Sequence, residues 1–265
     1  MIRPVFANTA WVTAPRRAVV KGEGWGLVRL RVRCGLIVHP VKGPVLIDAG
    51  YGPRVTTGRD RSLPLKLYNA ALGPRLNPLE SPLALLADHG FGPQDVRCVL
   101  LTHLHADHVS CLRDLPHARI VMDGPSAGHW RHGVFNELLP GDLAGRRDDL
   151  RRHSLADLPF GLGQGYDVFG DGSCLAMPLP GHAPGHYGLC FTGEKPLLYA
   201  TDTQWMRAAV AAGRAPRFLP GLIAENTRLV AQSTDLVRKF ADAGGEVLLC
   251  HDPESTAHDW TPTDV

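Results

Sequence analysis

The seven residues from Thr102 to His108 constrain this chain more than any other stretch. They read Thr-His-Leu-His-Ala-Asp-His and directly follow a mostly apolar run. Alternate residues of an extended chain point the same way, so His103 and His105 can bind one metal ion together. Asp107 and His108 stand in the turn that follows and can reach a second, nearby ion. Because imidazole and carboxylate are ligands that zinc and similar divalent ions prefer, the motif predicts a metal site rather than a histidine-rich surface loop.

Three further candidate ligands stand where other strands are expected to end. His182 lies in a loop whose glycines and prolines fix a sharp turn. Asp202 ends the apolar run 196–202, and His251 ends the run 246–251. Strand ends are where open α/β sheets gather their functional sites. We therefore expect these side chains to join the first motif in one metal centre.

The motifs and their order resemble those of the metallo-β-lactamase superfamily, over most of the chain. The landmarks are Leu46 to Gly50, Thr102 to His108, Pro180 to His182, Thr201-Asp202 and His251. The resemblance implies an α/β fold of the αβ/βα four-layer sandwich type, with two β-sheets face to face, helices outside and metals at one edge. Within the superfamily the pattern is most similar to the N-acyl-homoserine lactone lactonases and related small-lactone hydrolases.

The resemblance also implies two divalent metal ions per chain, with zinc as the first choice and iron, manganese or cobalt as alternatives. The implied ligands are His103, His105 and His182 for one ion, Asp107, His108 and His251 for the other, and Asp202 as a bridge between both. Asp48 is implied to orient a ligand imidazole from behind. His186, four residues past His182, is a second candidate for such a supporting place.

The expected chemistry is the opening of a lactone or small carboxylic ester by a hydroxide that bridges the two ions. A water shared by two divalent cations ionises near neutral pH. Asp107 and Asp202 are the candidate catalytic groups, because either carboxylate can carry the proton. Thioester hydrolysis of the glyoxalase II type, phosphodiester hydrolysis and a low-turnover regulatory binding protein stay open as alternatives.

Position 205 departs from the lactonase pattern. The lactonases carry a tyrosine three residues after the bridging aspartate, and this chain has Trp205 there. An indole donates one hydrogen bond but cannot act as an acid. Trp205 is therefore a candidate substrate contact, and packing beneath the following helix is the equal alternative.

Composition and charge narrow the class of protein. The net charge of +2 does not favour a nucleic-acid partner. The N-terminal residues contain no long apolar core, so neither a signal peptide nor a membrane span is expected. Six cysteines show no Cys-x-x-Cys spacing, and most of them stand in apolar runs where buried, reduced thiols are expected. We expect a cytoplasmic enzyme with a small-molecule substrate, and a homodimer stays open.

A single domain over residues 1–265 is expected because the candidate ligands run from His103 to His251 and tie two similarly patterned halves, roughly 1–165 and 166–265, together. The expected strands are 28–33, 36–40, 45–48, 119–122, 173–179, 187–191, 196–202 and 246–250, with a turn at Gly35. Helices are expected after Ser81-Pro82 and around residues 229–240, and a solvated helix at 146–152. Two irregular stretches, 51–78 and 130–160, are candidates for substrate contact, with 63–72 and 130–139 as pocket walls.

Overall fold

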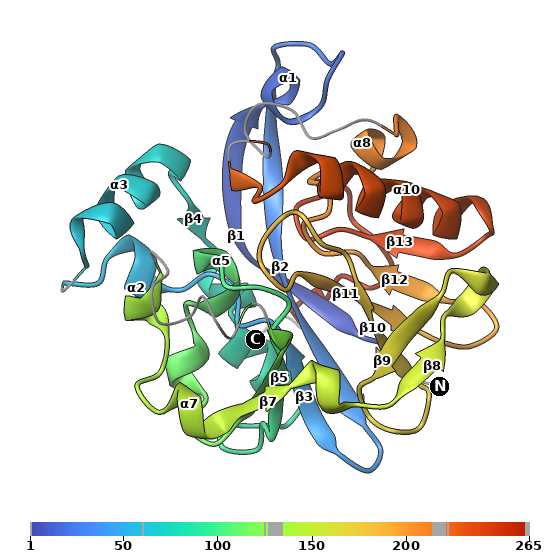
Figure 1. The fold of residues 1–265 in the computed structure, drawn as a ribbon. Helices are drawn as coiled ribbons and strands as arrows, with labels where there is room; N and C mark the ends of the chain where they lie inside the picture. The colour runs from blue at the N-terminus through green and yellow to red at the C-terminus, as the bar shows by residue number, and fades with distance from the viewer. Residues whose placement is uncertain are drawn as a thin grey trace.

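The computed structural model describes residues 2–59, 61–124, 126, 135–213, 221 and 223–262. Two mixed β-sheets lie face to face, and helices cover their outer sides (Figure 1). The expected four-layer αβ/βα architecture is therefore confirmed. Among the described residues, no helix is both long and apolar enough to span a bilayer.

The first sheet has seven strands in the order β4-β1-β2-β3-β5-β6-β7. Their bounds are β1 (Val5–Pro15), β2 (Leu27–His39), β3 (Gly43–Ile47), β4 (Arg75–Leu76), β5 (Cys98–Leu100), β6 (Arg119–Met122) and β7 (Arg147–Asp149). The pairs from β3 to β7 are parallel, whereas β1 pairs antiparallel with β2 and β4. The β1–β2 hairpin extends beyond the rest of the sheet and carries α1 (Arg16–Val19) at its tip (Figure 1).

The second sheet has six strands in the order β13-β12-β11-β10-β9-β8. Their bounds are β8 (Leu155–Asp157), β9 (Gln164–Asp167), β10 (Cys174–Pro178), β11 (Tyr187–Phe191), β12 (Leu197–Tyr199) and β13 (Glu246–Leu248). Only the pair of β12 with β13 is parallel among these strands. The strands expected at 173–179, 187–191, 196–202 and 246–250 are confirmed, although β12 and β13 end two or three residues earlier than expected.

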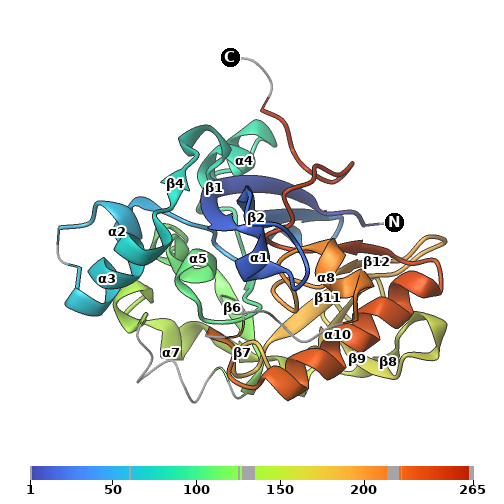
Figure 2. The ribbon, with the colours of Figure 1, turned by 90° about the horizontal axis from the view of Figure 1, so that it is seen from above.

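Side chains of the second sheet alternate between two apolar layers, as the strand period of two requires. On β10, Ala176 packs into the core between the sheets, and Leu175 and Met177 pack outward. The outer layer receives Val237 and Phe240 from α10 (Thr227–Asp242), which lies along this sheet in Figure 2. The expected long helix is therefore confirmed. Its N-cap Asn226 accepts hydrogen bonds from the next backbone amides.

The remaining helices surround the first sheet and the strand ends. They are α2 (Pro53–Thr56), α3 (Leu63–Leu72), α4 (Pro82–Asp88), α5 (Ala106–Val109), α7 (Leu143–Arg146) and α8 (Arg207–Ala211), with short 3-10 turns at η1 (Pro78–Glu80), η2 (Leu112–Asp114), η3 (Asn136–Leu138), η4 (Leu150–Arg152) and η5 (Pro159–Gly161). The helix expected after Ser81 is α4, and the Ser81 hydroxyl accepts a hydrogen bond from the amide of Ala84. That expectation is confirmed.

The expected turn at Gly35 is wrong, because β2 runs unbroken through it. A Cβ atom at residue 35 would lie 2.8 Å from Phe6 Cε1 and 2.9 Å from Ile47 Cδ1. Glycine at this position therefore permits close packing inside the sheet rather than a change of chain direction.

The solvated helix expected at 146–152 is also wrong. Residues Arg147–Asp149 form β7, which pairs with β6 at the edge of the first sheet. Charged side chains suit an exposed edge strand as well as a solvated helix, because they discourage pairing with a second molecule. Charge alternation alone did not distinguish the two structures.

Candidate metal centre

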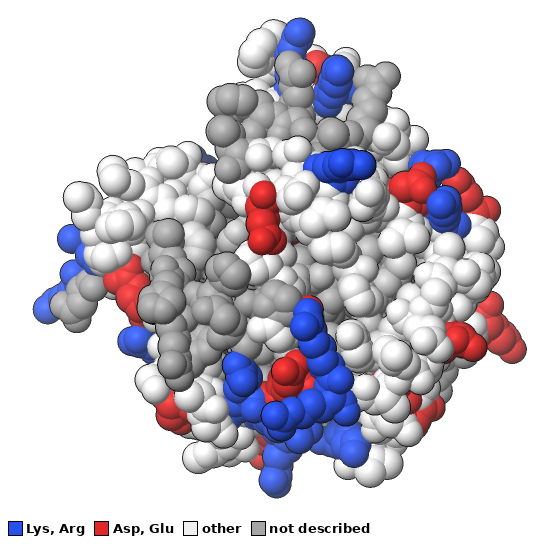
Figure 3. Space-filling model, in the orientation of Figure 1, with Lys and Arg blue, Asp and Glu red and all other residues white. Residues whose placement is uncertain are grey.

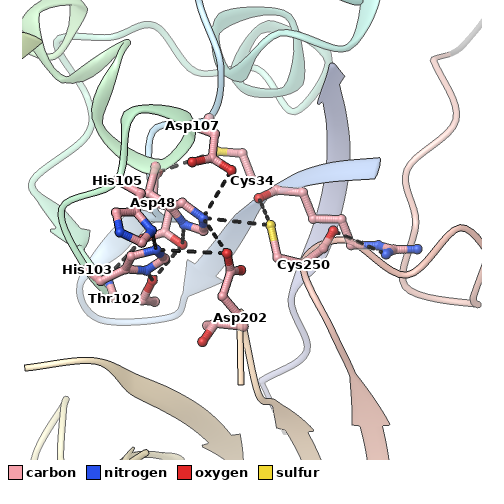
Figure 4. A network of polar contacts seen from close by, with 12 residues as sticks. Cys34, Asp48, Thr102, His103, His105, Asp107, Asp202 and Cys250 are labelled. Carbon is pink, nitrogen blue, oxygen red and sulfur yellow. Dashed lines mark hydrogen bonds and ion pairs between the residues drawn. The ribbon is translucent and has the colours of Figure 1, made fainter. Parts of the chain in front are cut away.

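Four strands deliver the predicted ligands to one edge of the sandwich. The parallel strands β3 and β5 lead into Asp48 and into the motif from Thr102 onward, and the parallel strands β12 and β13 end three residues before Asp202 and His251. His182 comes from the loop between β10 and β11. Figure 4 shows His103 and Asp107, from the segment that follows β5, on one side of the centre and Asp202 on the other.

The first group of candidate ligands is His103, His105 and His182 with Asp202. Their donor atoms all lie within 4.8 Å of one another. His105 Nδ1 is 3.1 Å from His103 Nε2 and 3.0 Å from His182 Nε2. Zinc–nitrogen bonds of about 2.0 Å hold two ligand nitrogens roughly 3.3 Å apart in tetrahedral geometry. The three imidazoles therefore converge as ligands of one ion do.

The tautomer of His103 follows from its neighbours. The Thr102 hydroxyl donates its one hydrogen to Asp48 Oδ2 at 3.0 Å, so its oxygen accepts from His103 Nδ1 at 3.1 Å. The Nε2 lone pair of the neutral His103 ring consequently points toward His105 Nδ1. Burial holds the pKa values of His103 and His182 well below the usual range, which keeps both rings neutral and able to bind a metal.

The second group of candidate ligands is His108, His251 and Asp107, again with Asp202. His251 Nε2 lies 2.9 Å and His108 Nε2 lies 3.6 Å from Asp202 Oδ2. Asp107 Oδ2 is 3.4 Å from the same His251 nitrogen and 3.5 Å from the same His108 nitrogen. The thiol of Cys250 also belongs to this group, because its sulfur lies within 4.8 Å of the donor atoms of His108, Asp202 and His251.

Each ring of the second group is fixed from behind by an acceptor. His108 Nδ1 donates to Asp48 Oδ2 at 2.8 Å, and His251 Nδ1 donates to the Arg31 carbonyl at 2.7 Å. In the neutral tautomers both Nε2 lone pairs then face the Asp202 carboxylate, which only accepts. This juxtaposition is favourable only if a cation lies between them or a proton is taken up. The contact that the family resemblance implied for Asp48, with a candidate ligand imidazole, is present.

Electrostatics favour a cation at this place. Burial opposes ionisation of Asp202, but His251 and His108 outweigh it and hold the pKa of this carboxyl well below its usual range. Burial likewise opposes charge on His108 and His251, yet the surrounding carboxylates raise the pKa of both rings. Asp202 Oδ1 is buried and has no hydrogen-bond partner among the described residues. The donor set therefore fits two divalent cations that share Asp202.

His186 stands behind the ligands and not among them. Its Nδ1 donates to the Leu179 carbonyl at 2.6 Å, and its Nε2 accepts from the Thr201 hydroxyl. Both ring nitrogens are thus used, and burial lowers its pKa to about 4. The ring centroid lies 5.3 Å from those of His103 and His182, so His186 supports these two rings.

A cavity of about 380 Å³ opens beside the centre. Its walls are mostly apolar, and they comprise Val12, Leu30, Tyr51, Tyr68, Ala71, Leu72, His105, Asp107, Phe135, Asp202, Trp205, Ile223 and His251. The predicted walls at 63–72 supply Tyr68, Ala71 and Leu72. Of the second predicted wall, 130–139, Phe135 lines the cavity, whereas Trp130 and Val134 lie outside the described residues.

Trp205 contacts both the cavity and the apolar packing beneath the following helix, the two alternatives that the sequence left open. Its indole lines the cavity, and its ring centroid lies 5.3 Å from that of His251. The same side chain is buried in a small apolar cluster with Leu30, Val20 and Ala209. Its Nε1 has no hydrogen-bond partner among the described residues. Trp205 therefore forms a rigid wall next to a candidate ligand.

Two contributors to the site were missed from the sequence. Cys250 was read only as a buried thiol, although its place directly before His251 was a usable signal. Arg33 is fully buried and donates to the carbonyls of Leu249 and Asp252, on both sides of His251. No pattern marked Arg33, because its partners lie more than 200 positions away.

Comparison with known proteins agrees with this geometry. A family model described as the metallo-beta-lactamase superfamily matches residues 27–250. The N-acyl homoserine lactonase AttM of Azorhizobium caulinodans is 29% identical over 236 residues, covering 83% of this chain and 81% of that protein. AttM of Agrobacterium fabrum is 29% identical over 230 residues, covering 84% and 82%.

Solved structures share the fold at lower identity. A variant of AiiA from B. thuringiensis with N-decanoyl-L-homoserine bound has 17% identity and a TM-score of 0.71, covering 94% of this chain and 92% of its own. AidC, a dizinc quorum-quenching lactonase, has 14% identity and a TM-score of 0.66, covering 100% and 95%. The chain belongs to the metallo-beta-lactamase superfamily, and it is a hydrolase whose relatives include N-acyl homoserine lactonases.

Proposed function

We propose that this protein is a dinuclear metal-dependent hydrolase that opens lactones or related small carboxylic esters. The observation that carries the proposal is the convergence of two ligand groups on Asp202, at the base of a mostly apolar cavity. His103, His105 and His182 hold one ion in this proposal. Asp107, His108 and His251 hold the other, and Asp202 contacts both. Zinc suits the imidazole-rich donor set.

Different side chains of the site contribute metal binding, proton transfer and exclusion of water to the proposed hydrolysis. Bound divalent ions supply Lewis acidity, both to ionise a coordinated water near neutral pH and to neutralise charge on a carbonyl oxygen. Asp107 lines the cavity beside His251, so its carboxylate can take the proton of the attacking water and pass it to the leaving oxygen. Trp205, Tyr68 and Phe135 exclude water from the apolar part of the substrate.

The cavity favours a neutral ester over a phosphodiester. Its described lining contains two carboxylates and neither lysine nor arginine, so it lacks the side chains that usually bind a phosphate. On the face shown in Figure 3, basic side chains gather near β7, where Arg151 pairs with Asp123 and Arg119 pairs with Asp148. The relatives also support an ester substrate, since AttM is described as an N-acyl homoserine lactonase.

A substrate panel tests the proposal. Zinc-reconstituted protein should open N-acyl homoserine lactones or other small lactones, and chelator-treated protein should lose this activity and regain it with zinc. Thioesters and phosphodiesters serve as the competing substrates. Turnover of phosphodiesters alone, or full lactone opening by protein shown by elemental analysis to contain no metal, would contradict the proposal.

A further inference from the structure

Cys250 is the one thiol that the structure brings into a group of candidate metal ligands among the described residues. All six cysteines are free and buried. Cys34, on strand β2 of the first sheet, contacts the Asp48 carbonyl at 3.4 Å and lies outside both ligand groups. Burial alone therefore does not account for the position of Cys250.

The backbone presents the Cys250 sulfur to the centre in a fixed place. The Cys250 amide donates to the Thr201 carbonyl at 3.0 Å, which joins the ends of β12 and β13 next to Asp202. The Arg33 guanidinium holds the preceding Leu249 carbonyl at 3.0 Å and the following Asp252 carbonyl at 2.8 Å. These contacts fix the backbone of Cys250, so the Cβ atom that carries the sulfur is held next to Asp202 and His251.

The distances suit coordination of a metal by sulfur. Cys250 Sγ lies 4.0 Å from His108 Nε2, and its other contact is the Arg33 carbonyl at 3.7 Å. A zinc ion with a Zn–S bond of about 2.3 Å and a Zn–N bond of about 2.0 Å holds sulfur and nitrogen roughly 3.6 Å apart. A few tenths of an ångström of movement would complete this geometry. Asp202 belongs to the same group. Its second carboxylate oxygen, Oδ1, is buried and has no hydrogen-bond partner among the described residues.

We propose that Cys250 binds the second metal ion as a thiolate, together with Asp107, His108, His251 and Asp202. The inference rests on the proposed metal centre and adds a ligand to it. On binding, the thiol releases its proton to solvent and the sulfur forms a bond to the ion. Asp107 approaches the same two imidazoles at 3.4 and 3.5 Å, so two carboxylates and one thiolate would surround the ion. A soft sulfur ligand favours zinc over manganese at this position.

Cobalt spectroscopy tests the sulfur bond without relying on activity. Metal-free protein titrated with Co²⁺ should develop visible ligand-field bands and a near-ultraviolet sulfur-to-cobalt charge-transfer band. Cys250→Ala should lose the charge-transfer band and keep the ligand-field bands of the first group. Cys34→Ala, a matched buried thiol, should keep both. Ligand-field bands without a charge-transfer band in the unmodified protein, or a charge-transfer band that survives Cys250→Ala, would overturn the inference.

X-ray absorption on the zinc-loaded, unmodified protein gives a second test that needs no variant. We expect a sulfur scatterer at about 2.3 Å from zinc, at half occupancy when two zinc ions are bound. A shell of nitrogen and oxygen alone would refute the thiolate ligand and leave the proposed hydrolase intact. Failure to bind either metal would instead refute the proposed function together with this inference.

Discussion

Asp48 illustrates how a single residue organises one half of the centre. It adopts a left-handed backbone conformation, with φ 59°, directly after β3. Its carboxylate accepts hydrogen bonds from the Thr102 amide at 2.8 Å, from the Thr102 hydroxyl at 3.0 Å and from His108 Nδ1 at 2.8 Å. One side chain therefore fixes the His108 ring directly and the His103 ring through Thr102.

We expect Asp48→Asn to weaken metal binding roughly 10- to 100-fold, as loss of a carboxylate behind a ligand imidazole typically does. Asparagine tolerates the left-handed backbone, so the fold should persist. Competition titration with a chromogenic chelator measures the change. Asp171→Asn, at an exposed carboxylate that contacts His39, provides the control. Equal metal affinity in both variants would argue against the assigned role of Asp48.

Asp202 is the residue that both ligand groups share. Replacing it by alanine removes a negative charge from the midst of His103, His182 and His251, and it removes one proposed ligand from each ion. We expect Asp202→Ala to contain fewer than two metal ions per chain and to lose lactone opening. Elemental analysis after zinc reconstitution measures the number of zinc ions per chain. A variant that still holds two ions would show that Asp202 does not bridge them.

At the scale of elements, α3 forms one wall of the cavity. Ser62 caps its N-terminus by accepting from the Leu65 amide, and Gly73 ends it with φ 53°. Tyr68 stacks edge-on against Phe135 with centroids 4.9 Å apart, and Tyr68 and Leu72 line the cavity. Leu67, on the same helix, is 61% exposed. The helix thus presents one apolar face to the cavity and another to solvent.

This arrangement predicts different effects for two leucines of the same helix. Leu72→Ala should raise KM for lactones with a long acyl chain roughly tenfold, because lost apolar contact in a pocket costs about 1–3 kcal/mol. Removal of such binding contact should leave kcat nearly unchanged. Leu67→Ala, the matched control, should leave both constants unchanged. Steady-state kinetics across an acyl-chain series checks the prediction, and equal effects of the two substitutions would exclude α3 as a substrate wall.

The sequence was most informative where local pattern and chemistry coincide. His103, His105, Asp107 and His108 lie within six positions, and the strand-end rule brought Asp202 and His251 to them correctly in space. The pattern failed at β7, where charges suit an edge strand and a solvated helix alike. It also failed for contacts between distant segments. Arg33 has an ordinary place in an alternating strand, and nothing near it indicates that residues 249–259 fold around its guanidinium.

At the scale of the whole molecule, Arg33 ties the C-terminal segment to the first sheet. It donates to both Asp259 oxygens, at 2.7 and 2.9 Å, and to the Glu254 carbonyl at 2.7 Å. Farther along, the Trp260 amide donates to the Phe6 carbonyl at 2.8 Å. The buried guanidinium of Arg33 therefore holds the segment that carries His251 in place. That the two halves form one domain stays a prediction, which cooperative unfolding in one transition would support.

Breaking the Arg33–Asp259 pair should destabilise the fold in a pH-dependent way. Asp259→Asn should lower the free energy of unfolding by roughly 3 kcal/mol near neutral pH, because it leaves the buried guanidinium without its counter-charge. Burial raises the pKa of Asp259, but Arg33 outweighs this and holds it below the usual value. The pair's contribution is therefore fully present above the unfolded pKa of about 3.9 and is lost as the pH falls through the folded pKa.

Urea unfolding of both proteins along a pH series, followed by circular dichroism, measures this difference. The gap between them should be constant from neutral pH down to about pH 5 and should shrink below about pH 4, where the native carboxyl is also protonated. Asp235→Asn, which removes a carboxylate from the exposed pairs with Arg238 and Lys239 on α10, should show little difference at any pH. A gap that does not narrow in acid would mean that Asp259 stabilises the segment through its hydrogen bonds and not through its charge.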